Sequence, residues 1–299
     1  MRTLCFGEAI VDLICQRPVS SLAEADAFVA HSGGVVCNAA VTAARLGAAV
    51  SLAGGAGDDH WGAWLHDRLT VEHVDLRWFG LADGLRTALA FVTLDEHGEP
   101  HYELYGDGVA AAISALDERL LEGVDACDAL LFTSNTLAGA PEAALTLAAR
   151  ERALELGRPI VFDPNVRLGR WDQSPGRAAA AGQCVPGAFL VKCNRYEARV
   201  LTGESEPEAA AASLLAAGAQ HVIVTDGAAG AILRAKGLRH EIAGRPARAV
   251  STTGAGDVFL GVLLAHLGKT DFYPPALAAA LPEAAEEAAR ACERWGALE

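Results

Sequence analysis

The stretch Ser251-Thr252-Thr253-Gly254-Ala255-Gly256-Asp257-Val258-Phe259-Leu260-Gly261 joins a turn of small residues to the start of an apolar run. We expect a strand over residues 245–250 and a helix that begins within the stretch. A helix start leaves backbone N–H groups unpaired, and these groups favour an anion together with the helix dipole. Gly254, Ala255 and Gly256 would let a phosphate approach the backbone, and Asp257 could accept a proton from an attacking hydroxyl. A capped helix after a glycine turn explains the same residues, so the stretch alone leaves both interpretations open.

The length and composition favour one large α/β domain. The chain has 299 residues, of which 52% are hydrophobic, enough for a substantial core. No apolar run reaches the roughly 18 residues that a membrane helix needs. The amino-terminal residues include Glu8 and Asp12 and lack the basic segment and long apolar core of a signal peptide. We therefore expect a cytoplasmic protein that does not bind membranes.

The net charge limits the possible binding partners, and the cysteines indicate the redox compartment. A net charge of −14 with only three lysines argues against binding to nucleic acid or to an anionic membrane. Any phosphate site must therefore use backbone groups, a few arginines and a divalent cation. The seven cysteines form no Cys-x-x-Cys pair, and an odd, scattered set of thiols is typical of a reducing compartment.

Strand and helix patterns alternate through the chain without a repeat or linker. This alternation predicts a single domain over residues 1–299, with a mostly parallel sheet sandwiched by helices. The expected strands begin with residues 2–15, and the last expected helix covers residues 276–298. Because ligands of open α/β sheets bind beyond the carboxyl ends of the strands, polar residues that follow the strands would gather at one edge.

A hairpin interrupts this alternation. Residues 87–94 and 100–105 flank Glu96-His97-Gly98, and the second arm carries Tyr102 and Tyr105. We expect a small sheet, formed from parts of about 13–30 and 86–107, that projects from the main domain and acts as a lid. A plain surface hairpin is the alternative. The exposed edge of such a sheet is a natural surface for a homodimer.

Several polar residues lie near predicted strand ends. Asp12 interrupts the first apolar strand, where it is either a ligand for a hydroxyl or a plain strand-end carboxylate. Gly33 and Gly34 precede a helix and permit a ligand to approach the backbone, and the Asn38 amide can both donate and accept. Arg167 follows Asp163-Pro164-Asn165 and is a candidate for neutralising phosphate charge.

The spacing of Asn194 and Glu197 places both at one side of a helix start. The same spacing is that of an ordinary capping box, which is the simpler interpretation. Further on, Asp226-Gly227-Ala228-Ala229-Gly230 forms a turn between two predicted strands.

In their order along the chain, these motifs resemble those of the ribokinase (PfkB) family of carbohydrate and nucleoside kinases. The resemblance covers nearly the whole length. It is carried by Gly33-Gly34 with Asn38, Gly57-Asp58-Asp59 with Gly62, Asp163-Pro164-Asn165, Asn194-x-x-Glu197, Thr225-x-Gly227-x-x-Gly230 and Thr253-Gly254-Ala255-Gly256-Asp257.

The resemblance implies a ribokinase-like fold with a small β lid and transfer of the γ-phosphate of ATP to a hydroxyl of a small sugar. Asp257 would be the base, and the backbone of Gly254, Ala255 and Gly256 would form the anion hole. Glu197 would bind Mg²⁺ through water. The residues implied on the nucleotide side are Asn194, Thr225, Asp226, Gly227, Gly230 and Thr253. The residues implied on the sugar side are Asp12, Gly33, Gly34, Asn38, Tyr105 and Arg167.

The motifs look most like those of the fructokinase and 2-keto-3-deoxygluconate kinase branch. Kinases of keto-acid sugars tend to carry an arginine after the lid tyrosine, whereas Gly106 follows Tyr105 in this chain. A neutral ketohexose such as fructose is therefore favoured, with 2-keto-3-deoxygluconate, a nucleoside or a catalytically silent sugar- or nucleotide-binding protein as alternatives. Ser251 replaces an aspartate that the family links to a potassium site, so the resemblance leaves a requirement for K⁺ open.

Overall fold

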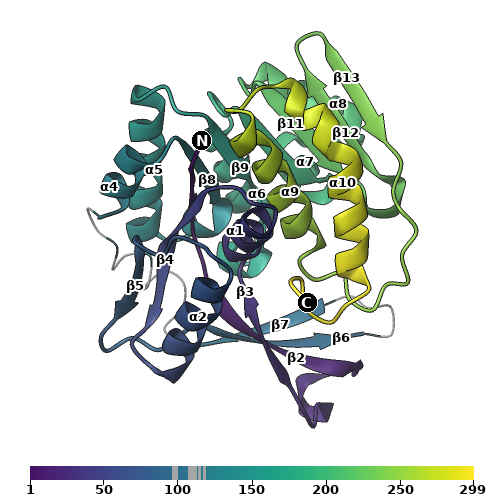
Figure 1. Ribbon diagram of the computed structural model, residues 1–299. Helices are drawn as coiled ribbons and strands as arrows, with labels where there is room; N and C mark the ends of the chain where they lie inside the picture. Colours follow the sequence, from purple (N-terminus) through teal and green to yellow (C-terminus); the bar gives the residue numbers. More distant parts are fainter. Residues whose placement is uncertain (96–99, 107–112, 114–115, 117–118) are drawn as a thin grey trace.

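A nine-stranded sheet forms the centre of the protein in this computed structural model, which describes residues 1–95, 100–106, 113, 116 and 119–299 (Figure 1). The strand order is β13-β12-β11-β10-β9-β8-β1-β4-β5. Neighbouring strands are parallel except at β11–β12 and β12–β13, so the expected mostly parallel sheet is confirmed. The strands are β1 (Thr3–Phe6), β4 (Val50–Gly57), β5 (Phe79–Ala82), β8 (Ala129–Thr133), β9 (Ile160–Asp163), β10 (Leu190–Asn194), β11 (His221–Thr225), β12 (Ala231–Ala235) and β13 (Leu238–Ile242).

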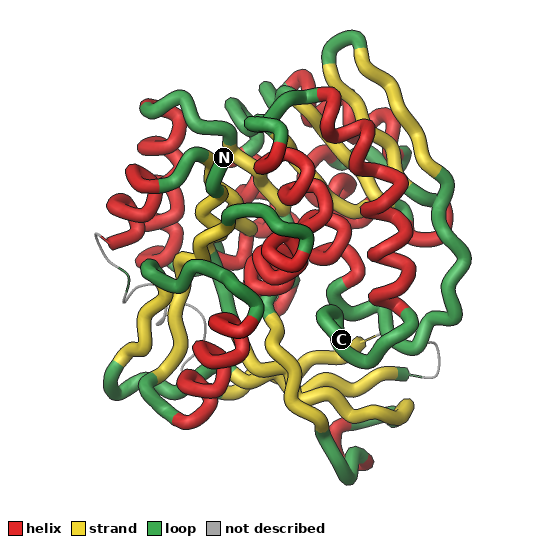
Figure 2. The backbone as a smooth tube through the Cα atoms, viewed as in Figure 1, coloured by secondary structure: helices red, strands yellow, loops and turns green. Residues whose placement is uncertain are grey.

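Helices cover both faces of this sheet because successive strand residues point to opposite sides. Cys5 and Leu131 belong to one hydrophobic core, and their neighbours Leu4 and Leu130 belong to the other. The first core is covered by α1 (Val35–Arg45), α2 (His60–Val71), α9 (Ala255–Lys269) and α10 (Pro275–Cys292). The second is covered by α4 (Arg119–Ala126), α5 (Ala140–Glu155), α6 (Pro175–Ala178), α7 (Arg195–Thr202) and α8 (Pro207–Ala216). The resulting three layers are visible in Figure 2.

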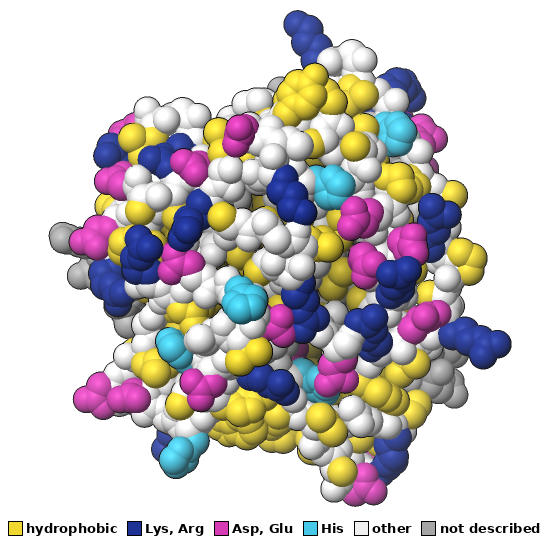
Figure 3. Space-filling model, in the orientation of Figure 1, with side chains coloured by type: hydrophobic (Ala, Val, Ile, Leu, Met, Phe, Trp, Pro, Cys, Tyr) yellow, Lys and Arg dark blue, Asp and Glu magenta, His cyan; other side chains and the backbone are white. Residues whose placement is uncertain are grey.

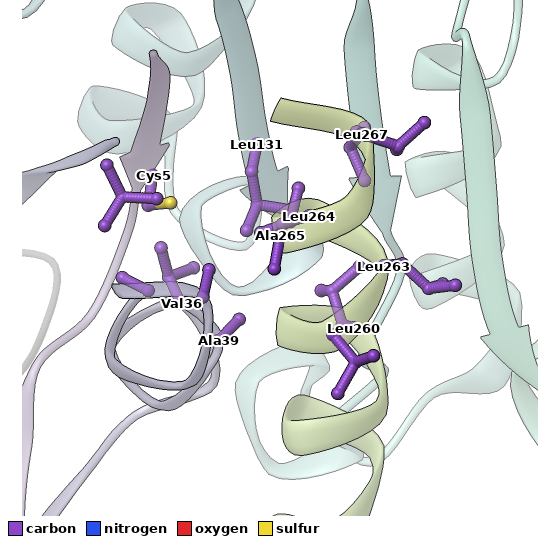
Figure 4. Close-up of a cluster of buried hydrophobic side chains, with 14 of the residues drawn as sticks. Cys5, Val36, Ala39, Leu131, Leu260, Leu263, Leu264, Ala265 and Leu267 are labelled. Carbon is purple, nitrogen blue, oxygen red and sulfur yellow. The ribbon is translucent and has the colours of Figure 1, made fainter. Parts of the chain in front are cut away.

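Helix α9 packs against both α1 and α10, and its leucines fill the space above the sheet (Figure 4). The crossing of α1 and α9 is close because Gly261 has no side chain. A Cβ atom at Gly261 would lie 2.4 Å from the Cβ of Thr42 and 2.7 Å from the carbonyl oxygen of Ala39. This crossing brings the starts of both helices to the same place.

A second, four-stranded sheet lies beside the main domain, with the order β3-β2-β6-β7 (Figure 1). Its strands are β2 (Ile10–Pro18), β3 (Val29–Gly33), β6 (Leu89–Leu94) and β7 (Pro100–Tyr105). They include segments of both ranges expected for the lid, whereas the expected turn at Glu96-His97-Gly98 lies outside the described residues. We call these four strands the small sheet.

Three expectations about local structure are wrong. Residues 2–15 form two strands in different sheets, β1 and β2, because the chain turns at Gly7, whose φ is 155°. Asp12 therefore lies within β2 and not at a strand end. Residues 245–250 form no strand, and the last helix ends at Cys292, so residues 294–299 are not helical.

In the described part of the chain, every helix is too short or too polar to span a membrane.

Candidate active site

The turn at residues 253–257, which we call the 253–257 turn, begins α9 next to the small sheet, where Tyr102 of β7 approaches Thr253. Gly254 is the N-cap residue with a φ of 74°, a left-handed conformation that glycine adopts readily, and no side chain caps the helix. The backbone at Gly254, Ala255 and Gly256 thus forms an uncapped helix start. Such a start offers N–H groups and a positive dipole end to an anion.

Asp257 lies in the first turn of α9 and is only 6% exposed. Its Oδ2 accepts a hydrogen bond of 2.9 Å from Asn38 Nδ2, across the α1–α9 crossing. Burial raises the pKa of Asp257, and the Asn38 amide and the positive charges of Arg167 and Lys192 oppose this rise. A buried carboxylate with a raised pKa accepts a proton more readily than an exposed one, as a general base requires.

On the small-sheet side of Asp257, the structure brings together Asp12, Gly33, Gly34 and Asn38. The Asp12 carboxylate lies against Gly33, and Gly34 is the N-cap residue of α1. Burial and the nearby charge of Asp257 raise the pKa of Asp12 to about 7, although Arg167 opposes them. Asp12 Oδ1 and Asn38 Oδ1 are both buried and have no hydrogen-bond partner among the described protein groups.

Glu8 and Asn135 extend this polar group, although neither belongs to a recognised sequence motif. Glu8 follows β1, and its Oε1 accepts a hydrogen bond of 2.8 Å from Asn135 Nδ2 in the turn after β8. Burial raises the pKa of Glu8. Glu8 Oε2 and Asn135 Oδ1 are buried and without a partner among the described groups. The only signal in the sequence was their position after two apolar strands.

Four buried oxygen atoms, from Glu8, Asp12, Asn38 and Asn135, therefore each lack a hydrogen-bond donor among the described groups. All are hydrogen-bond acceptors, and leaving a buried acceptor unpaired costs about 1–3 kcal/mol. A ligand with several hydroxyl groups supplies the donors that would satisfy them.

A buried ion pair lies beside the 253–257 turn. Lys192 Nζ in β10 donates to Asp163 Oδ2 at 2.9 Å, and both side chains are buried. Burial lowers the pKa of Lys192, but Asp163 and Glu197 outweigh this effect, so the pKa is raised and the ammonium stays charged. A Cβ atom on Gly256 would lie 3.1 Å from Lys192 Nζ. One of the three lysines of the chain is thus at the turn, a position that no sequence motif predicted.

Asn194 and Glu197 form the capping box that their spacing allowed. Asn194 Oδ1 accepts from the Glu197 N–H at 2.9 Å, and Glu197 Oε2 accepts from the Asn194 N–H at 2.8 Å. Burial, followed by the charge of Asp163, raises the pKa of Glu197. The described residues contain no group of three or more His, Cys, Asp or Glu side chains that could hold a metal ion.

On the other side of the turn, a cavity of about 340 Å³ runs between the β11–β12 connection and α10. Its walls are mostly alanine and glycine, and Thr225, Gly227 and Gly230 lie on the same cavity as Ala255 and Gly256. An adjoining groove of about 470 Å³ shares Thr225 and Gly227 and adds Asn194 and Asp226. The carboxylate of Asp226 accepts from Arg195 at 3.1 Å.

The structure places Tyr102, and not Tyr105, at the site. Tyr102 lies with its hydroxyl 3.5 Å from Thr253 Oγ1, and the Arg167 guanidinium is 5.8 Å from the centre of its ring. Tyr105 is 50% exposed, contacts Phe91 and donates its hydroxyl to Glu103. Tyr105 therefore points away from the 253–257 turn, and its contact with a substrate stays a prediction. Residues three apart in a strand point to opposite faces, so only one of the two tyrosines can face the turn.

Comparisons with known proteins agree with this arrangement. The family described as pfkB family carbohydrate kinase matches residues 2–294. Fructokinase-2 of Oryza sativa subsp. japonica is 32% identical over 267 residues, which cover 89% of this chain and 80% of the rice protein. Fructokinase-1 of Zea mays is 33% identical over 268 residues, which cover 88% and 82% of the two chains. The crystal structure of a fructokinase double mutant from Vibrio cholerae O395, in a fructose-, ADP- and potassium-bound form, superimposes with a TM-score of 0.84 at 28% identity and covers 99% of this chain and 94% of that one.

Proposed function

Because the chain belongs to the PfkB family of carbohydrate kinases and is a phosphotransferase acting on a sugar hydroxyl, we propose that it transfers the γ-phosphate of ATP to a neutral ketohexose such as fructose. The observation that carries the choice of acceptor is the group of four buried acceptor oxygens beside Asp257. Hydroxyl groups satisfy these atoms, whereas a sugar carboxylate would lie near the carboxyl groups of Glu8 and Asp12. The fructokinases of rice and maize and the fructose-bound form of the Vibrio cholerae enzyme support the same choice.

In the proposed reaction, Asp257 takes the proton of the acceptor hydroxyl as the hydroxyl oxygen forms a bond to the γ-phosphorus. The bond from this phosphorus to the bridging oxygen breaks, and ADP leaves with the electron pair. General-base catalysis contributes about 10²–10⁴-fold in related reactions. The backbone N–H groups of Gly254, Ala255 and Gly256, with Lys192 and Arg167 nearby, would stabilise the negative charge of the transferred group.

The cavity of about 340 Å³ is proposed to hold the adenosine of ATP, and its small wall residues leave room for a flat base. Thr225, Gly227 and Gly230 line it, and the phosphates would lie where the same cavity reaches Ala255 and Gly256. Asn194 and Asp226 line the adjoining groove. Mg²⁺ would be held mainly by the phosphates and by water near Glu197, since this ion keeps several waters and needs few protein ligands. When bound, Mg²⁺ neutralises phosphate charge.

A sugar acid such as 2-keto-3-deoxygluconate is the second candidate acceptor. The observation in its favour is Arg167, whose guanidinium stands at the Tyr102 ring and could pair with a carboxylate. A nucleoside acceptor would need an aromatic wall, for which Tyr102 is a candidate.

A coupled assay of ADP release tests these proposals. The acceptors would be fructose, other hexoses, pentoses, 2-keto-3-deoxygluconate and nucleosides, each with MgATP and with and without K⁺. We expect fructose or a related neutral ketose to give the highest kcat/KM. Preference for the sugar acid would overturn the neutral acceptor, and binding of ATP and sugar without turnover would favour a catalytically silent binding protein.

We also propose that two copies of the chain associate through the small sheet. Its outer face carries an edge-to-face series of Phe28, Phe91 and Tyr105, with ring centres 5.1 Å and 5.2 Å apart, and hydrophobic side chains gather over this region in Figure 3. Sedimentation of the wild type and of Tyr105→Glu tests this, since a dimer through this face predicts a monomeric variant. Six buried cysteines that form no disulfide support a reducing compartment such as the cytoplasm.

A further inference from the structure

Residues 294–299, which follow α10, run between the 253–257 turn and the small sheet, and Figure 1 shows the end of the chain beside the strands of that sheet. We propose that this segment positions the 253–257 turn relative to the small sheet and so serves phosphoryl transfer without touching either substrate. The inference rests on the proposed kinase function, because it assigns the segment a role in that reaction.

The segment packs directly against the 253–257 turn. A Cβ atom on Gly254 would lie only 2.2 Å from the Cβ of Ala297, so the backbone of the turn rests directly on this alanine. Ala297 also belongs to a small hydrophobic cluster with Val258 in α9 and Ala291 in α10. A change in the position of Ala297 would therefore move the N-cap residue of the helix start that is proposed to bind the phosphate.

The same segment packs on the inner face of the small sheet. Trp295 contacts a hydrophobic cluster of Ile14, Ala90 and Val92, which come from β2 and β6. His31 in β3 is buried, and its Nδ1 lies 2.8 Å from Glu299 Oε1. Gly296 passes close to the His31 ring, because a Cβ atom there would lie 2.5 Å from Nδ1.

A third contact joins the segment to α1. Arg45 Nη1 donates to the carbonyl oxygen of Leu298 at 2.5 Å. Helix α1 also carries Asn38, the hydrogen-bond donor to Asp257. The segment thus contacts all three parts that must be aligned for transfer: the turn, the helix that orients the base, and the sheet that carries Asp12.

These contacts give the segment a mechanical role. Asp12 and Tyr102 belong to the small sheet, and the proposed phosphate site belongs to α9, so the distance between acceptor and phosphate depends on how these two bodies sit against each other. A displacement of about 1 Å between reacting groups can cost about 10²-fold in rate. Residues 294–299 fill the space between the two bodies and fix their separation.

The test compares Trp295→Ala with Trp78→Ala. Trp78 is also a partly buried tryptophan, but it packs near Gly123 in the second core, on the other face of the main sheet. We expect Trp295→Ala to lower kcat by about tenfold or more while the KM for ATP changes by less than about twofold. Trp78→Ala should lower the melting temperature but leave kcat within about twofold, and Trp295→Phe should restore most of the lost rate.

Two further measurements decide the remaining cases. If Trp295→Ala does not fold, Ala297→Val is used, which pushes on Gly254 without removing core volume, and an unchanged kcat in this variant overturns the proposal. Hydrogen exchange of the amides of residues 253–257 requires no turnover. Faster exchange in Trp295→Ala than in Trp78→Ala supports the positioning role even if no sugar is phosphorylated, and equal exchange with equal kcat contradicts it.

Discussion

The two sides of the 253–257 turn are built from different groups. The cavity on the α10 side is lined mainly by alanine and glycine, so its shape comes from the backbone and from the absence of side chains. The small-sheet side is formed by buried polar side chains, including Glu8, Asp12 and Asn38, with oxygen atoms that have no protein partner among the described groups. A site lined by backbone and small side chains selects a ligand by its shape. A site lined by unpaired acceptor oxygens selects a ligand whose hydroxyl groups can donate hydrogen bonds to them. Changes on the two sides should therefore affect different kinetic constants.

The largest effect is expected where the two sides meet. Asp257→Asn keeps the size of the side chain but removes the proposed base, so kcat should fall by about 10³-fold while the affinity for ATP stays nearly the same. Turnover by a coupled assay and ATP binding by calorimetry measure the two quantities. Comparable activity in the variant would show that Asp257 is not the base.

Filling the cavity should weaken binding at the proposed nucleotide site alone. Ala288 lines the cavity, and Ala288→Trp would occupy part of the space proposed for adenosine. Overpacking costs about 1–3 kcal/mol, so the KM for ATP should rise by about 10–100-fold with little change in the KM for the sugar. Equal loss of both affinities would mean that the two sides are not separate sites.

The reverse change is expected on the small-sheet side. Glu8→Gln exchanges a buried acceptor oxygen for an amide, which removes one partner for a sugar hydroxyl. We expect the KM for the sugar to rise by about tenfold and the KM for ATP to stay within about twofold. The thermal stability of the variant is the control, because a loss of both affinities together with a lower melting temperature would indicate damage to the fold.

A smaller effect of pH on the KM for the sugar is expected on the small-sheet side. The pKa of Asp12 is raised to about 7, chiefly by burial, so this carboxyl gains a proton as the pH falls through neutrality. The ionised form accepts stronger, charge-assisted hydrogen bonds, and the KM for the sugar should therefore increase several-fold between about pH 8 and about pH 6. Asp12→Asn should abolish this dependence, and a KM that varies equally in both proteins would assign the titration to another group.

The smallest effect is expected from potassium. Ser251 Oγ accepts from the Thr253 N–H at 3.1 Å, and the carbonyl oxygen of Cys292 accepts from the N–H groups of Val250 and Ser251. These contacts between uncharged groups fix the backbone that precedes the turn. Added K⁺ should therefore change kcat by less than about twofold, which corresponds to a free-energy difference smaller than RT. Ser251→Asp is the comparison, since a carboxylate at this position should introduce a response to K⁺. Strong activation of the wild type would contradict this account of the turn.

The motifs on the cavity side were easier to recognise in the sequence than Glu8, Asn135 and Lys192. Thr225, Gly227, Gly230 and the 253–257 turn are short local motifs, and their function depends on backbone geometry that neighbouring residues encode. Glu8 and Asn135 stand alone in the sequence and become a pair only because parallel pairing places the ends of β1 and β8 side by side. Lys192 likewise acquires its place from contact with Asp163, 29 residues away.

By itself, the sequence determined the alternation of strands and helices, the order of the motifs and the position of Asp257 in the first turn of a helix, because these depend on periodicity and on local backbone preferences. The tertiary structure decided that Asn38 reaches Asp257 across 219 residues and that Tyr102 rather than Tyr105 faces the site. It also decided that residues 294–299 are not helical and that Ala297 packs against Gly254. These outcomes depend on which faces become buried against each other, a property of packing that no local stretch of sequence contains.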